Sequence, residues 1–427
     1  MPLVNFVVRR QVVFHLIQLM LGVVGGSGSA LLLNIYLARV LSVEDYGVFY
    51  SAQTFAVALS LLIGFGFSQY ILAVFGEKKY EASLYIRPLF KLLLLNAIVF
   101  LAIYLIMTFN LSESVVESYV LWLLIPFALG QVGTEVVATR LQIDGGYSKL
   151  AMWQFLPHTA RLSFVLICGL FYQKVNIQLI AAMYGCIGLC TFLFGLVVLR
   201  SLCDRGVDQK RVSTLNDVQV FVVLRGLAPY GVAAVLGYTY SQGNILMVRY
   251  LAEPYEAGLF SVVLTIVNSA LLIPVVVFHK YLAPQYHNWA FNDKEKLRSA
   301  FSIANITMLF LGLTLAAILY LFGDLFVLYI FGEKYIGAFE VLAIAAISIP
   351  IYFQCYSSAA ILSIRLNMQK KIGYMAIAAL LNVGLNLVLI PEYGALGASI
   401  AMVVSYLFLG GAYYTAAKTY LNSEVIA

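Results

Sequence analysis

The chain has 427 residues, of which 62% are hydrophobic and only 11% are charged, and its mean hydropathy is +0.92. A soluble domain carries about 25% charged residues. The composition therefore excludes a soluble globular protein and indicates a polytopic membrane protein. The net charge of +6 does not indicate a nucleic-acid partner, and the five cysteines show neither a disulfide framework nor a metal-ligand pattern. We expect no cofactor and no metal.

Runs without Asp, Glu, Lys or Arg that are long enough to cross the bilayer, roughly 20 helical residues, predict an all-α protein with twelve transmembrane helices. One of these spans is interrupted only by Arg161. The spans are 11–38, 46–76, 92–112, 118–134, 150–173, 175–199, 226–248, 257–278, 299–323, 341–364, 372–391 and 393–417. The runs lack the alternation of a membrane β-barrel, so helices are the expected elements.

The basic residues fall almost entirely on one side of the membrane when the connections are assigned to alternate sides. The poor side holds only Arg39, Lys174, Arg249 and Lys334, and the other side holds the remaining Lys and Arg except Arg161. By the positive-inside rule, both termini are expected in the cytoplasm of a multi-pass protein. One wrong span would scramble this pattern, so the distribution supports the count of twelve.

The longest connection, roughly 200–225, is charged and linker-like, and it separates two sets of six spans. We therefore expect an N-terminal six-helix bundle at 1–200, a cytoplasmic linker at 201–225 and a C-terminal six-helix bundle at 226–427.

The two halves repeat weakly around the end of the first span of each. "NIYLARVLSVEDYGVF" at 34–49 matches "NILMVRYLAEPYEAGLF" at 244–260. The aligned pairs are Asn34 with Asn244, Arg39 with Arg249, and Gly47 with Gly258. Six spans per half give both copies the same orientation, so the bundles are expected to be related by a pseudo-two-fold axis along the membrane normal.

The first span carries Gly25, Gly26 and Gly28 within "GGSGS" at its centre. No Lys-Ser/Thr follows the run, which excludes a phosphate-binding loop. Two interpretations stay open: small residues let helices approach closely, and Gly/Ser pairs are common kink sites at which the span could bend during gating. Arg39 and Arg249, at helix ends beside acidic loops, either pair with those loops or contact substrate on the outer side.

Glu135 lies at the inner end of the fourth span. An intramembrane carboxylate can relay protons or bind a coupling cation, with H⁺ and Na⁺ equally open. It can also pair with Arg140 or with Arg161.

Gln154, His158 and Arg161 lie on one face of the fifth span, near Pro157. A cation near the bilayer centre costs about 2.5–3.5 kcal/mol on insertion scales, so Arg161 must face the bundle interior. The stripe predicts an electropositive wall for pyrophosphate or an acidic sugar, because Arg can hold two phosphate oxygens. The alternative is a structural ion pair, for example with Glu135.

The C-terminal half has no mid-span charge and is expected to supply a neutral, hydrogen-bonding wall. Its candidate substrate contacts are Tyr240, Gln242, Asn244, Asn382 and Asn386. Asn382 and Asn386 are four residues apart, and they serve equally well as contacts between packed helices.

Three segments resemble one family. "LARVLSVEDYGVFYSAQTF" at 37–55, "YIFGEKYIGAFEVLAIAA" at 329–346 and "LLNVGLNLVLIPEYGALGASIAMVVS" at 380–405 are similar to segments in corresponding places of Wzx-type O-antigen and polysaccharide flippases. These belong to the multidrug/oligosaccharidyl-lipid/polysaccharide (MOP) exporter superfamily, which also holds MATE exporters and lipid II flippases. Where the family often has an acidic residue in the seventh span, this chain has Gly243-Asn244.

The resemblance implies a MATE-like fold and a flippase of the bacterial inner membrane. Such a protein moves an undecaprenyl-pyrophosphate-linked oligosaccharide, as in O-antigen or lipopolysaccharide biosynthesis, from the cytoplasmic to the outer leaflet by alternating access. Its partners would be that substrate, membrane lipids, and polysaccharide polymerase or ligase proteins, with no nucleic acid. The alternative is a MATE-like cation-coupled antiporter of drugs or metabolites. No Walker A or HExxH motif occurs, so we expect a transporter and not an enzyme.

Overall fold

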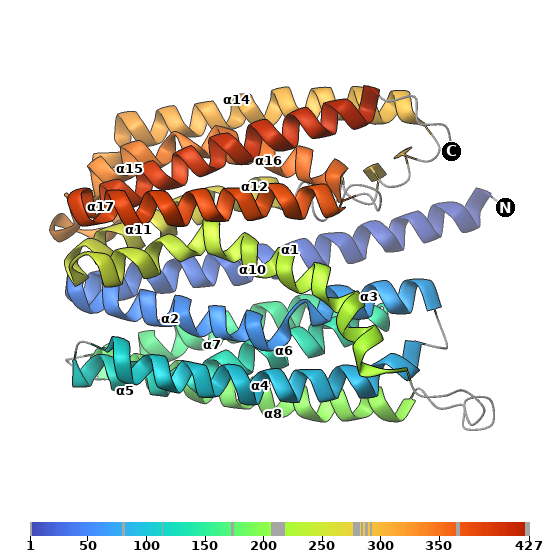
Figure 1. Ribbon diagram of the computed structural model, residues 1–427, viewed down its shortest axis with the longest axis horizontal. Coiled ribbons are helices and arrows are strands. Elements are labelled where there is room, and N and C mark those ends of the chain that lie inside the picture. Colours follow the sequence, from blue (N-terminus) through green and yellow to red (C-terminus); the bar gives the residue numbers. More distant parts are fainter. Residues whose placement is uncertain are drawn as a thin grey trace. The chain divides into compact units, whose positions relative to one another are not determined.

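The computed structural model describes residues 2–78, 82–112, 114–171, 175–205, 218–275, 282, 285–286, 289–290, 293–363 and 368–422. These residues are almost all helical, and none of them lies in a strand. Helices satisfy every backbone polar group internally, which the bilayer core requires. Figure 1 traces the helices in chain order. They are α1 (Pro2–Val40), α2 (Val43–Gly64), α3 (Phe67–Lys78), α4 (Ser83–Leu111), α5 (Val115–Leu123), α6 (Ile125–Ile143), α7 (Tyr147–Phe171), α8 (Ile177–Arg205), α10 (Val220–Leu251), α11 (Pro254–Ala270), α12 (Leu272–Val275), α14 (Lys294–Phe326), η3 (Val327–Phe331), η4 (Glu333–Tyr335), α15 (Ala338–Ala346), α16 (Ser348–Leu362) and α17 (Met368–Asn422).

Each of the twelve predicted spans coincides with a helix, or with a pair of helices separated by a short break. Across the described residues, 9 helices are long and apolar enough to cross a membrane, or 10 when the bent pair α15–α16 counts as one span. One of these, α17, contains the last two predicted spans, which meet at Gly394, where φ is 54°. Of the other predicted span, 257–278, residues 257–275 correspond to α11 and α12, and 276–278 lie outside the described residues. The prediction of an all-α polytopic protein is confirmed.

The chain forms two compact units. The first unit comprises Met1–Leu33 and Ala52–Val235, and the second unit comprises Asn34–Ser51 and Leu236–Ala427. The units are thus not simply the two halves of the sequence, because residues 34–51 pack with the C-terminal half. Of the expected linker, residues 206–217 lie outside the described part, while 201–205 continue α8 and 220–225 begin α10.

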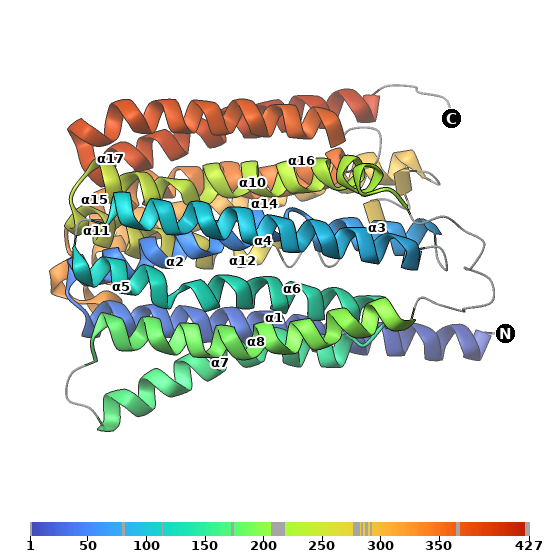
Figure 2. The ribbon, with the colours of Figure 1, turned by 60° about the horizontal axis from the view of Figure 1, so that its bottom comes forward.

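In the first unit, α6 and α8 lie side by side (Figure 2) and are held together by glycines. A Cβ atom on Gly130 would lie 2.4 Å from the Gly188 carbonyl oxygen, and one on Gly195 would lie 2.5 Å from the Gly133 Cα. Only residues without a side chain allow this approach, which is the usual device for packing helices in lipid.

In the second unit, α14, α15, α16 and α17 form one group of neighbouring helices (Figure 1). The break in α17 is capped from another helix: the Ala395 backbone N–H donates to Glu256 Oε2 over 2.9 Å. Because Gly394 has positive φ and its Cβ would lie 2.6 Å from the same carboxylate oxygen, this corner requires glycine.

The start of α2 meets the start of α11 inside the second unit. A Cβ atom on Gly47 would lie 2.5 Å from the Gly258 backbone nitrogen, and one on Gly258 would lie 2.1 Å from the Val43 carbonyl oxygen. These two glycines are the pair aligned by the internal repeat.

Candidate functional site

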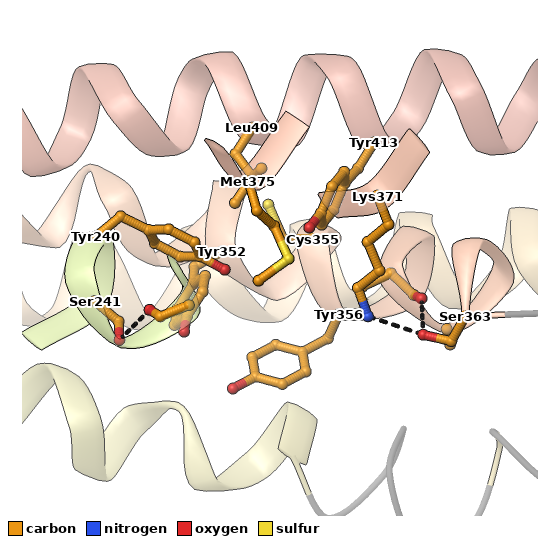
Figure 3. A pocket seen from close by; sticks show the side chains of 13 residues that line it. Tyr240, Ser241, Tyr352, Cys355, Tyr356, Ser363, Lys371, Met375, Leu409 and Tyr413 are labelled. Atoms are coloured by element: carbon orange, nitrogen blue, oxygen red, sulfur yellow. Dashed lines mark hydrogen bonds between the residues drawn. The ribbon is translucent and has the colours of Figure 1, made fainter. Parts of the chain in front are cut away.

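The second unit contains a cavity of about 380 Å³ between α10, α16 and α17. Its wall on α16 follows one helical face, because Tyr352, Tyr356, Ala359 and Ser363 recur at intervals of three or four residues. The polar residues that line the whole cavity are Tyr240, Ser241, Tyr352, Tyr356, Ser363, Lys371 and Tyr413. Figure 3 shows Lys371 and Ser363 at one end of the cavity and Tyr240 and Ser241 at the other.

Lys371 provides the only formal charge among the described residues that line this cavity. Its Nζ donates to Ser363 Oγ over 2.8 Å, and Ser363 Oγ in turn donates to the Ala359 carbonyl over 2.7 Å (Figure 3). In the described part of the chain the ammonium forms no ion pair. One donated hydrogen bond leaves two N–H groups of the ammonium free for a ligand.

The tyrosines form a continuous aromatic wall. The ring of Tyr352 lies 4.3 Å from that of Tyr406 and 5.3 Å from that of Tyr356, measured between centroids. The ring of Tyr240 meets Tyr406 edge-on at 5.9 Å. The hydroxyl of Tyr413 is buried without a hydrogen-bond partner among the described residues. Such an orphan donor is costly unless a ligand or water satisfies it.

The predicted asparagines lie together next to this wall. Asn386 Nδ2 donates to Asn244 Oδ1 over 2.6 Å and to Asn382 Oδ1 over 3.1 Å, and all three side chains are buried. They join α10 to α17. Gln242 Nε2 donates to Asn268 Oδ1 on α11 over 3.2 Å. Among the predicted residues of this half, Tyr240 is the one that lines the cavity.

Arg161 lies inside the first unit, where α7 meets α6 and α8. Its side chain is only 4% exposed. The guanidinium carbon lies 4.9 Å from the ring centroid of Phe127 and 4.8 Å from that of Tyr184. Desolvated cation–π contacts of this kind contribute about 2 kcal/mol each. Its Nε has no hydrogen-bond partner among the described residues.

The expected ion pair between Arg161 and Glu135 is not formed, and Glu135 does not pair with Arg140 either. Arg140 Nε instead bonds Asp144 Oδ2 over 2.8 Å, one helical turn further along. Glu135 Oε2 accepts a hydrogen bond from Ser68 Oγ over 2.8 Å. The structure thus separates the two charged residues that the sequence suggested as partners.

Gln154 and His158, on the same helix as Arg161, lie against the glycine run of α1. A Cβ on Gly26 would lie 3.0 Å from the Gln154 carbonyl oxygen and 3.5 Å from His158 Cδ2. Gly25 faces the Phe155 ring, whereas a Cβ on Gly28 would meet no atom within 4 Å. Helix α1 is uninterrupted from Pro2 to Val40. Close packing is therefore present in this structure, and bending during transport stays a prediction.

Single substitutions in this region of α1 can distinguish a packing role of the glycines from a role in bending. A Cβ on Gly22 would lie 2.6 Å from the Ala151 carbonyl oxygen, so Gly22→Ala is expected to destabilise the protein by about 1–3 kcal/mol. Gly28→Ala has free space and gains up to about 1 kcal/mol of helix propensity. If α1 bends, Gly28→Ala lowers transport while its unfolding temperature stays at or above that of the parent. Unchanged transport by Gly28→Ala would leave the packing role alone.

Arg39, predicted to pair with an acidic loop or to contact substrate, forms no ion pair among the described residues and instead makes a reciprocal clamp with Lys334 in the second unit. Arg39 Nε donates to the Ile330 carbonyl over 2.7 Å, and Lys334 Nζ donates to the Arg39 carbonyl over 3.1 Å and to the Leu41 carbonyl. Arg39 thus caps carbonyls at the end of η3, and Lys334, in the following element η4, caps carbonyls at the end of α1. Partial burial lowers the pKa of Lys334, and the Glu44 carboxylate opposes this shift. Arg249, which the internal repeat aligns with Arg39, is buried with its guanidinium 5.6 Å from the Tyr250 ring.

Removing one half of the clamp is expected to weaken this corner. Lys334→Met keeps the length of the side chain but leaves the last carbonyls of α1 without their donor, at a cost of about 1–2 kcal/mol. The unfolding temperature of the purified protein measures this loss. Lys91→Met, at an exposed position of α4, is the control, and equal melting of the two variants would contradict the role of the clamp.

The chain matches the family model described as "Polysaccharide biosynthesis protein" over residues 15–280. No curated protein sequence shows significant similarity to it. Among solved structures, an outward-facing MATE family multidrug resistance transporter of the MOP superfamily is 17% identical, with 95% of this chain and 94% of that chain covered and a TM-score of 0.65. The lipid II flippase MurJ in an inward closed conformation is 14% identical, with 94% and 87% covered and a TM-score of 0.65. A mutant of the Vibrio cholerae MATE transporter VcmN is 15% identical, with 96% and 97% covered and a TM-score of 0.64.

Proposed function

Because this chain belongs to the polysaccharide biosynthesis protein family and has the fold of MOP-superfamily transporters, we propose that it is a flippase for an undecaprenyl-pyrophosphate-linked oligosaccharide. The substrate would be a repeat unit of O-antigen or of another surface polysaccharide. It would move from the cytoplasmic to the outer leaflet of the bacterial inner membrane, with both termini of the protein in the cytoplasm. The one-sided distribution of Lys and Arg supports this orientation.

The cavity of the second unit is the observation that carries the proposal. It combines the ammonium of Lys371, tyrosine rings, and serine and tyrosine hydroxyls, and the described part of its lining contains no carboxylate. An ammonium binds phosphate as a point charge. Tyrosine offers an apolar face together with a hydroxyl, which suits a sugar ring that carries both C–H and O–H groups. The donor set therefore favours an anionic, hydroxyl-rich ligand.

Alternating access would have to act on three helices. The chain passes from one unit to the other at Leu33–Asn34 in α1, at Ser51–Ala52 in α2 and at Val235–Leu236 in α10. None of these points is a loop, so any movement of the units must bend or tilt these helices. We propose that the glycine run of α1, a few residues before its crossing point, serves this bending.

A MATE-like antiporter is the second candidate, because two of the similar structures are MATE transporters. An exporter of cationic drugs is expected to offer a carboxylate in an apolar pocket. The cavity of the second unit offers the opposite charge.

Complementation tests the proposal. The chain is expressed in a strain that lacks its polysaccharide flippase but makes the matching lipid-linked repeat unit, and surface polysaccharide is measured. We expect restored display and no gain in drug resistance in a strain without its drug exporters. If the chain restored drug resistance but not the surface display of polysaccharide, the result would contradict the flippase proposal and support the antiporter.

A further inference from the structure

The first unit contains a break in a membrane helix that the proposed function does not use. Helix α2 ends at Gly64 and α3 begins at Phe67. At the break, Phe65 has φ 37° and Gly66 has φ 79°. Phe65 is the only residue other than glycine with positive φ in the described chain. Strain of this kind persists where the surroundings enforce it, and it gathers at functional sites.

The break is held in place by α10. A Cβ on Gly66 would lie 2.5 Å from the Gly231 backbone nitrogen, and a Cβ on Gly231 would lie 2.5 Å from the Phe65 ring. With its 22 residues, α2 is about 33 Å long at 1.5 Å per residue. The break therefore lies near one edge of the ~30 Å hydrocarbon layer, where ions arrive from water.

A cavity of about 210 Å³ opens at this break, between α2, α3, α6 and α10. Oxygen-bearing side chains line it: Ser60, Ser68, Gln69, Gln131 and Glu135. The backbone of the break, Gly64 to Phe67, forms part of the same wall. A helix end leaves its last carbonyls without intrahelical partners, so α2 adds backbone acceptors to this set.

Glu135 supplies the single negative charge among the described residues that line this cavity. Its Oε2 lies 2.8 Å from Ser68 Oγ, and Thr139 Oγ1 lies 2.8 Å from both Ser68 Oγ and the Glu135 carbonyl oxygen. The carboxylate forms no ion pair with any Lys, Arg or His in the described part of the chain. Arg140 is committed to Asp144, and Arg161 to its two aromatic rings.

We propose that this cavity is a binding site for a monovalent cation of the size of Na⁺, with Glu135 as its charged ligand. One carboxylate balances one positive charge. Carboxylate, hydroxyl, amide and carbonyl oxygens are the donors that hard cations prefer. The C-terminal end of a broken membrane helix carries partial negative charge and is a recurrent cation ligand in transporters.

The proposed cation site also contacts a helix, α10, that continues into the second unit. Its wall includes Ala234 of α10, and α10 passes into the second unit at the next two residues, Val235–Leu236. A bound cation would neutralise Glu135 and fix the break against this segment. The inference does not depend on which glycan is carried, because the cation site and the lysine cavity lie in different units.

The chain has 3 Trp, and Trp153 reports on this site because its Nε1 donates to the Thr134 carbonyl over 3.1 Å, one residue before Glu135. In the full chain carrying Trp122→Phe and Trp289→Phe, NaCl is titrated at constant pH against choline chloride at constant ionic strength. We expect a saturable fluorescence change and an unfolding temperature that rises with Na⁺, as mass action requires.

Glu135→Gln is expected to weaken the apparent Na⁺ affinity at least tenfold, and Ser68→Ala severalfold. Glu340→Gln, which removes a carboxylate from the first turn of α15 in the second unit, is expected to behave as the parent. An undiminished Na⁺ response in Glu135→Gln would overturn the proposal. So would a response to pH alone, which would assign a proton to the site, or the absence of a saturable response in the parent. None of these results bears on complementation, so the two proposals fail separately.

Discussion

Gly258→Ala is expected to abolish or severely reduce the yield of folded protein. The new Cβ would lie 2.1 Å from the Val43 carbonyl oxygen, and the matching change at Gly47 would place a Cβ 2.5 Å from the Gly258 nitrogen and 2.5 Å from the Pro254 carbonyl oxygen. All of these neighbours are backbone atoms, so relief requires α2 and α11 to move apart. Overpacking in a well-packed core costs typically 1–3 kcal/mol and occasionally more. Because the backbones of α2 and α11 face each other directly here, we expect a loss of stability at the upper end of this range.

The yield of monodisperse protein and its unfolding temperature measure the effect. Gly411→Ala is the matched control, because Gly411 belongs to α17 of the same unit and a Cβ there would meet no atom within 4 Å. We expect Gly411→Ala to purify and melt like the parent. If Gly258→Ala did the same, the close approach of α2 and α11 would be absent from the protein in solution.

The same glycine pair shows which features of the fold can be predicted from the sequence. The alignment of Gly47 with Gly258 came from a weak repeat, and the structure places these two positions in contact. The membrane spans could also be predicted, because charge-free runs of about 20 residues have few alternatives to membrane helices. Both features depend on spacing along the chain, which the sequence states directly.

The partners of charged side chains could not be predicted from the sequence in this way. Glu135 and Arg161 looked like a pair because both are rare charges inside predicted spans, yet Arg161 is held by the rings of Phe127 and Tyr184 and Glu135 by Ser68. In helices that are apolar on nearly all sides, hydropathy does not tell which face meets which neighbour. The aromatic residues that surround Arg161 are indistinguishable, in the sequence, from those that face lipid.

Lys371 was missed for a related reason. It counted only as one of the basic residues on the cytoplasmic side, although it lies one turn inside α17 and reaches Ser363. Tyr352 and Tyr356 were likewise compatible with an interfacial belt. A useful signal was available: Tyr352, Tyr356 and Ser363 keep helical spacing on one face of a span, and a polar stripe of this kind marks an inward face.

Lys371→Met is expected to reduce export of the lipid-linked oligosaccharide by about tenfold to a hundredfold, as a charge-assisted hydrogen bond of about 1.5–3 kcal/mol to the ligand would require. The change keeps the length of the side chain, and no carboxylate lines the cavity among the described residues, so none is left unpaired there. The amount of protein in the membrane is therefore expected to stay unchanged. Surface polysaccharide per unit of flippase, measured in the complementation strain, gives the effect.

Lys370→Met is the matched control, since it removes the same charge from the preceding, exposed residue. Tyr413→Phe separates a ligand contact from a structural one, because the Tyr413 hydroxyl is buried without a partner among the described residues. With no ligand to satisfy it, loss of that hydroxyl should leave the fold unchanged or stabilise it. A stable Tyr413→Phe protein with reduced export would assign the hydroxyl to the substrate. Equal export by Lys371→Met and Lys370→Met would show that the ammonium in the cavity of the second unit does not take part in transport.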